Sequence, residues 1–153
     1  MGNLRRVALL LLSLVVFAAP VVAKVLPTDP ERLVIETGDG PVEFSVELAL
    51  TPADRASGLM NRTSMAADHG MLFRFDQTRE VLMWMKNTPL SLDMLFIDEA
   101  GTVIRIAERT EPFSETIIPS IGPVRYVLEL NGGTTSQRGI SVGDTVRHRV
   151  IGE

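Results

Sequence analysis

Alternation of apolar and polar residues in short segments is the feature that most limits what this chain can fold into. In residues 43–50, the large apolar side chains Phe44, Val46, Leu48 and Leu50 fall on every second position. This period of two is typical of a strand with one buried face. Similar segments, separated by glycine- and proline-containing turns, occur at residues 32–36, 41–50, 71–75, 80–86, 92–98, 102–109, 124–130 and 145–151.

Many short strands at close spacing favour an all-β domain over a layered α/β fold. We therefore predict a mainly β fold, a single antiparallel β-sandwich or partly open barrel of jelly-roll type, with about eight short strands and one or two short helices. Residues 110–123 contain three prolines and are expected to form an irregular covering segment.

One short helix is predicted after the strand at residues 41–50, because the residue types change there to those that begin and end helices. Thr51 is suited to the N-cap, Pro52 to the first helical position and Asp54 to the first turn, and Gly58 ends the helix. We expect Gly58 and Gly70 to adopt positive φ or to pack very closely against neighbouring backbone.

The first 23 residues have the layout of a secretory signal peptide. Arg5 and Arg6 precede an apolar run that ends in small residues at Ala23. We predict cleavage near Ala23, a linker at residues 24–31, and a single domain at residues 32–153 located in the periplasm or secreted. The alternative is an uncleaved membrane anchor, since the apolar run is near the lower length limit for a membrane-spanning helix.

The charge of the predicted mature chain excludes some classes of partner. Without Arg5 and Arg6, 13 of the 15 basic residues remain against 19 acidic residues, a net charge of −6. Nucleic acid and anionic membrane surfaces are bound by basic patches, which this composition does not favour. The chain has no cysteine, so its stability depends on packing rather than on disulfides. We expect a monomer whose partner is a small ligand or a protein of the cell envelope.

Five sequence motifs resemble those of the domain-of-unknown-function family DUF192. They are GLMNR (58–62), GMLFRF (70–75), MWMKNTPLSLDMLFID (83–98), RYVLEL (125–130) and GISVGD (139–144), and the resemblance extends over about residues 43–150. The resemblance implies a compact, mainly β domain of the sandwich or jelly-roll type, found in bacteria and archaea and often exported. It implies no established reaction.

Two carboxylates within these motifs are the main candidates for chemistry. Asp93 shares a strand face with Leu95 and Ile97, and Glu129 shares one with Val127, so both are expected to be half-buried and to need partners. The ligand-binding hypothesis is a polar pocket near the turn at residues 86–89. Its candidate residues are Arg62, Lys86, Asn87, Asp93 and Glu129, with Arg125 as a further possible partner of the carboxylates. The alternative is structural: Asp93 caps backbone amides, and Glu129 pairs with an arginine.

The predicted function is a non-enzymatic binding or accessory protein of the cell envelope, because no catalytic constellation is recognisable. No catalytic residue, metal ligand or cofactor is nominated. One alternative is an envelope hydrolase that uses Asp93 and Glu129. A second is soft-metal binding of copper through methionines, five of which lie in the motif region. The two histidines, His69 and His148, are too few and too far apart in sequence to indicate zinc.

The only tryptophan, Trp84, lies in the apolar segment at residues 80–86. Both faces of this segment are largely apolar, so a central strand covered on both sides is expected. We interpret Trp84 as a core residue, with the wall of a polar pocket beside Lys86 and Asn87 as the alternative. The methionines around it are interpreted as flexible core packing.

Overall fold

The computed structural model describes residues 22–152 of the chain. Nearly all of the predicted signal peptide lies outside this range, so that assignment and the predicted location stay predictions. Within the described range, no helix is both long enough and apolar enough to cross a membrane.

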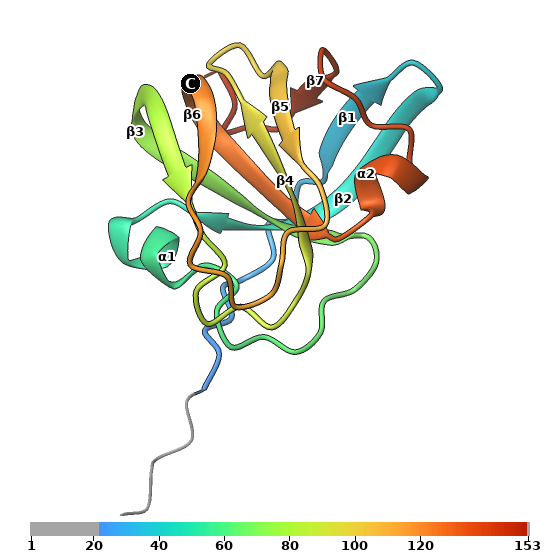
Figure 1. Cartoon of the computed structure of the whole chain (residues 1–153). Helices are drawn as coiled ribbons and strands as arrows, with labels where there is room; N and C mark the ends of the chain where they lie inside the picture. The colour runs from blue at the N-terminus through green and yellow to red at the C-terminus, as the bar shows by residue number, and fades with distance from the viewer. Residues whose placement is uncertain (1–21, 153) are drawn as a thin grey trace, which may run out of the picture.

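The domain is a seven-stranded mixed sheet that curves into a half-barrel, with two short helices outside it (Figure 1). The strands run in the spatial order β5-β4-β6-β3-β2-β1-β7. In chain order the elements are β1 (Leu33–Thr37), β2 (Gly40–Ala49), α1 (Pro52–Ser57), β3 (His69–Met83), β4 (Leu92–Ile97), β5 (Val103–Ala107), β6 (Ile118–Asn131), α2 (Thr134–Gln137) and β7 (Thr145–Arg147).

Backbone hydrogen bonds join the two edges of this sheet. The amide of Val103, at the start of β5, donates to the carbonyl of Asp144 at 2.9 Å, and the amide of Val146 in β7 donates to Gly101 at 2.7 Å. A bridge between Thr102 and Thr145 lies between these bonds. Both edge strands are short and in contact, which limits the length of open edge available to another chain.

The predicted mainly β fold with short helices is confirmed, but the strand count and the antiparallel arrangement were wrong. The segment expected at residues 71–75 and the first part of the one expected at 80–86 form one strand, β3, which ends at Met83 and stays paired with β6 through shifts in register on either side of Arg79. β2 and β3 are parallel, because a helix and a long loop connect them and return the chain to the same end of the sheet. A sandwich is not confirmed.

β6 also begins earlier than expected, inside the proline-rich segment. Pro119 and Pro123 pair with Leu82 and Glu80 of β3, whereas the pairing of β6 with β4 begins only at Tyr126. At positions 118–125 β6 is therefore an edge strand, where a residue without an N–H is tolerated.

Each face of the sheet carries its own apolar core, and β6 contributes to both. Tyr126, Leu128 and Leu130 belong to the first core, together with β1 and β7 residues such as Leu33 and Val146. Val127 points to the opposite face, where the second core is formed by Ala49, Leu59, Met71, Phe73, Phe75, Val81, Met85, Leu92, Met94, Phe96, Val124 and Val127. Glu129, two residues after Val127, faces this second core.

Helix α1 forms as predicted. Thr51 accepts a hydrogen bond from the amide of Asp54, and the Asp54 carboxylate accepts one from the amide of Thr51, which completes a capping box. Gly58 follows the helix with φ +45°, so the expectation for this glycine is confirmed. Its position turns the chain towards Leu59, which packs in the second core.

For Gly70, the expected close packing against neighbouring backbone is confirmed. A Cβ at this position would lie 2.7 Å from the Glu129 carbonyl oxygen and 2.7 Å from a Leu130 methyl group. We expect Gly70→Ala to destabilise the fold by about 1–3 kcal/mol because β3 and β6 must separate to admit it. Gly38→Ala, which meets nothing within 4 Å, is the control in urea denaturation. Equal midpoints for the two variants would contradict the packing argument.

Candidate functional site

A pocket of about 310 Å³ opens between α1 and β3 on the face of the second core. Its lining comes from four parts of the chain: α1, the turn after it, β3 with the segment that follows, and one residue of β6. The residues are Pro52, Arg55, Ala56, Ser57, Gly58, Leu59, Met60, Phe73, Phe75, Arg79, Leu82, Met83, Trp84, Thr88 and Glu129. Of this group, the sequence patterns nominated Glu129 and Trp84 for a polar pocket and Met60 and Met83 for a copper site.

Glu129 is the carboxyl group of this pocket. It stands opposite Met71 of β3 and Met94 of β4 in the sheet register, and the residue is 4% exposed. No side chain or amide of residues 22–152 is recorded as a hydrogen-bond partner of its carboxyl group. Burial raises the pKa of Glu129 to about 8, although the Arg62 charge acts to lower it. At neutral pH the group is therefore mostly protonated and offers an O–H donor to the pocket.

Aromatic rings and two arginines also belong to the pocket lining. The guanidinium groups of Arg55 and Arg79 each lie 5.5 Å from the centre of the Phe75 ring. Trp84 is 47% exposed, and the Lys86 ammonium lies 5.6 Å from the centre of its ring. Aromatic rings and positive charges thus lie side by side at this pocket.

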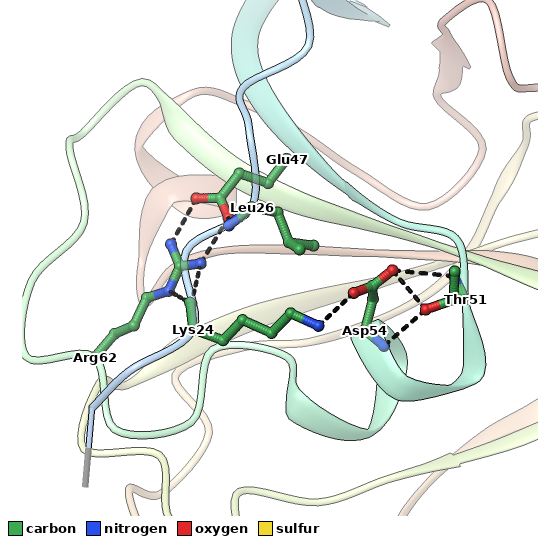
Figure 2. A network of polar contacts seen from close by, with 6 residues as sticks. All are labelled: Lys24, Leu26, Glu47, Thr51, Asp54 and Arg62. Carbon is green, nitrogen blue, oxygen red and sulfur yellow. Dashed lines mark hydrogen bonds and ion pairs between the residues drawn. The ribbon is translucent and has the colours of Figure 1, made fainter.

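Arg62 is close to this pocket but its charge is used elsewhere (Figure 2). Its two terminal nitrogens each lie 2.6 Å from one carboxylate oxygen of Glu47, and both side chains are buried. Glu47 also contacts His69 Nε2 at 3.1 Å and accepts a hydrogen bond from the amide of Leu26 at 2.7 Å. Burial raises the pKa of Glu47, but these hydrogen bonds outweigh it and leave the pKa below its usual value. The residue is therefore ionised and balances Arg62.

The same network holds residues 24–26 against the domain. The carbonyl oxygen of Lys24 accepts hydrogen bonds from Arg62 at 2.8 and 3.2 Å, and its ammonium lies 2.6 Å from the Asp54 carboxylate (Figure 2). Hydrogen bonds from Lys24 and Thr51 lower the pKa of Asp54 to about 2. The segment predicted as a linker is thus attached both to α1 and to the buried ion pair.

Asp93 belongs to a different environment. Its carboxylate accepts hydrogen bonds from the amides of Arg109, Gly133 and Thr135 at 2.8–2.9 Å and from the Thr135 hydroxyl at 2.7 Å. Burial raises the pKa of Asp93, but these donors outweigh it and keep the group ionised. The sequence analysis considered a structural role in which Asp93 caps backbone amides, and Asp93 has that role. The amides it caps, however, do not belong to the turn at residues 86–89.

The two carboxylates cannot act together, because they lie on opposite faces of the sheet. Met94 pairs with Glu129, whereas Asp93 pairs with Leu130. Neighbouring positions on a strand point to opposite sides. Asp93 and Glu129 therefore do not form a carboxylate pair for hydrolysis.

Of the five predicted ligand-binding residues, only Glu129 lines the pocket. Arg62 and Asp93 are committed to the structural contacts described above. Asn87, at φ +54°, accepts a hydrogen bond through its carbonyl from the amide of Asn61 at 2.7 Å. Lys86 reaches the outer ring of Trp84 but is not part of the lining.

The core interpretation of Trp84 was wrong, because the residue is 47% exposed. Trp84 does line a pocket, but this pocket lies between α1 and β3, and its lining includes neither Lys86 nor Asn87 of the alternative. β3 ends at Met83, so Trp84 lies beyond the paired part of the strand and is not covered on both sides. The methionines divide between two roles. Met71, Met85 and Met94 are fully buried in the second core, whereas Met60 and Met83 line the pocket. In the described part of the chain, no group of three or more His, Cys, Asp or Glu side chains is placed to hold a metal ion.

The fold and the motifs define a class of small, mainly β half-barrel domains without an assigned activity. The chain belongs to the DUF192 family, described as "Uncharacterized ACR", which it matches over residues 33–148. This confirms the resemblance seen in the sequence motifs. No curated protein matches the chain.

Solved structures are similar to it, among them the following two. One is a "putative transcription regulator" from Sinorhizobium meliloti 1021, with 51% identity and a TM-score of 0.77, covering 81% of this chain and 96% of the other. The second is a protein of unknown function from Novosphingobium aromaticivorans DSM 12444, with 37% identity and a TM-score of 0.78, covering 86% and 94%.

The buried Arg62–Glu47 pair leads to a stability prediction. Arg62→Met should destabilise the protein by about 3–5 kcal/mol, because Glu47 is left buried without its main counter-charge. Arg32→Ala is the matched control, since Arg32 forms only exposed ion pairs with Glu43 and Asp68 and should change stability by less than about 1 kcal/mol. Chemical denaturation at neutral pH measures both. Similar losses in the two variants would show that burial does not distinguish the pairs.

Glu129 leads to a prediction about pH. The usual pKa is 4.5 and the folded value is about 8, so between these values the folded state binds more protons than the unfolded state. The stability contributed by Glu129 is therefore full below the lower value and falls as pH rises through this window. Glu129→Gln should be more stable than the wild type above about pH 8, by on the order of a few kcal/mol, with the gain shrinking towards about pH 4.

Denaturation series across this pH range test the Glu129 prediction, with Glu80→Gln on the exposed surface as the control. A difference between Glu129→Gln and wild type that does not vary with pH would refute it.

Proposed function

We propose that this protein is a non-enzymatic binding domain that holds a small organic ligand in the pocket between α1 and β3. The observation that carries the proposal is Glu129, a buried carboxyl group that faces the pocket without a hydrogen-bond partner among the described residues. A carboxyl group that faces a pocket and has no partner among the described residues is available to a ligand, which would complete its hydrogen bonding.

The energetic cost of Glu129 supports this proposal. A carboxyl group with a raised pKa lowers folding stability at neutral and alkaline pH, and an apolar residue would fit the methionine-rich surroundings without that cost. Residues that reduce stability in this way tend to occur at functional sites. The volume of about 310 Å³ is at the lower end of the range of small-molecule pockets.

An enzyme is the second candidate, and the raised pKa of Glu129 is the observation in its favour. A carboxyl group that titrates near neutral pH suits general acid–base catalysis. A hydrolase with Glu129 and Asp93 as a pair is not supported, because the sheet separates them. A copper site would have to use Met60 and Met83 of the pocket, which is fewer thioethers than the five considered in the sequence.

The same proposal places the domain outside the cytoplasm as a monomeric envelope or secreted protein. Support comes from the signal-peptide layout of residues 1–23. One similar structure carries the name of a transcription regulator, but the net charge of −4 of this chain does not favour contact with nucleic acid.

The proposal is tested by screening the protein against a library of small organic metabolites. Trp84 is the only tryptophan and lies in the pocket wall, so its fluorescence reports occupancy directly. At least one compound should change the Trp84 emission and raise the melting temperature, since a ligand that binds only the folded state stabilises it. Glu129→Leu should weaken that binding.

Val142→Ser is the control, since Val142 is an exposed apolar residue outside the pocket, and it should leave binding unchanged. Failure of every compound, or equal binding by Glu129→Leu, would count against the proposal. If mass spectrometry shows that the protein converts a bound compound into a product, that result would support the enzyme hypothesis instead.

A further inference from the structure

We infer that the pocket selects small organic anions with an apolar body, held by Arg79 at the opening and by the Glu129 carboxyl group, which donates a hydrogen bond to an acceptor at the inner end. This inference rests on the proposed binding function and specifies the ligand class. It follows from the charges that remain uncompensated around the pocket.

Arg79 is the cation available to a ligand. Its side chain is exposed, and its one hydrogen bond among the described residues is to the carbonyl of Glu80 at 2.9 Å. Arg55, the other pocket arginine, is occupied: it donates to the carbonyls of Leu50 and Arg74 and lies 3.0 Å from the Asp76 carboxylate. A guanidinium with unused donors suits a carboxylate or another planar anion.

The groups around Glu129 leave it without an available counter-ion. β2 contributes Glu47, β3 contributes His69 and the loop after α1 contributes Arg62, and these three form one buried network. The positions opposite Glu129 on its neighbouring strands are the uncharged Met71 and Met94.

Arg55 of α1 and Arg79 of β3 are the remaining charged groups of the lining. With Arg55 balanced by Asp76 and with Glu129 protonated, the pocket has an excess of positive charge.

The walls between Arg79 and Glu129 define the body of the ligand. Phe73, Phe75, Leu82, Met83 and Trp84 of this lining are aromatic or large apolar residues. Aromatic and thioether groups pack well against a flat ring or a branched alkyl group. The polar groups of the ligand are then limited to its two ends.

A cationic ligand fits these observations poorly. It would require an ionised Glu129, which burial disfavours, and it would meet Arg79 and Lys86 near the opening. A carbonyl, ether or similar acceptor needs only the protonated carboxyl group. The same argument predicts that binding depends on the proton of Glu129.

Three matched probes test the inference, with Trp84 fluorescence as the readout. Para-acetylbenzoate carries the anion, the ring and the acceptor. Para-isopropylbenzoate lacks the acceptor, and para-acetylbenzylammonium replaces the anion by a cation. We expect para-acetylbenzoate to bind about tenfold more tightly than either of the other probes, because each of them lacks one of the two polar contacts.

The pH dependence of binding and three variants separate the contribution of Glu129 to affinity from that of Arg79. Wild-type affinity for para-acetylbenzoate should fall about tenfold per pH unit above about pH 8, since only the protonated form binds. Glu129→Gln, which keeps an N–H donor, should retain the affinity and lose this pH dependence. Arg79→Gln should remove the preference for the anion over the cation, and Val142→Ser should behave as wild type.

Tighter binding of the ammonium probe, or loss of binding in Glu129→Gln, would overturn the ligand class while leaving the pocket a binding site. No response to para-acetylbenzoate at millimolar concentration would also overturn it. The metabolite screen then stands as the separate test of the proposed function, because it does not assume an anion.

Discussion

The buried ion pair between Arg62 and Glu47 determines the chemical state of the pocket. Because both terminal nitrogens of Arg62 are bound to Glu47, its charge is largely neutralised beside Glu129. Glu129 then has no counter-ion and keeps its proton near neutral pH. The same pair binds the backbone of Lys24 and Leu26 (Figure 2), and Glu47 also contacts the ring of His69.

The parallel pairing of β2 and β3 creates the space for the pocket. Parallel strands require a crossover, and here the crossover consists of α1 and the loop that carries Arg62. α1 lies outside the sheet (Figure 1). Leu59, which follows it, packs in the second core with Val127, and residues of α1 line the pocket together with Glu129. An antiparallel hairpin between these strands would have left this face without α1 as a wall. The topology that the strand patterns did not predict is therefore the one that places the site.

Much of the local structure was predictable because the signals are local. The capping box of Thr51 and Asp54, the positive φ of Gly58 and the hairpin of β1 and β2 depend on residues close in sequence. The site was predictable only in part. Glu129 was identified from its position in an apolar strand, but Arg79 and Phe75 resemble ordinary strand residues. Nothing local marks them as neighbours of α1, because that contact depends on the crossover.

The sequence by itself determined the class of fold, the family and the strand faces, since alternation and turn residues act over a few positions. Only the tertiary structure decided how the charges pair. Arg62 was a candidate partner for both Asp93 and Glu129, and it binds Glu47 instead. Asp93 is satisfied by backbone amides, and Glu129 by no described group. The charged side chains come from elements that are far apart in sequence: β2, β3, β6 and α1. Which of them pair depends on the distances between these elements in the folded domain, and no single segment of the sequence determines those distances.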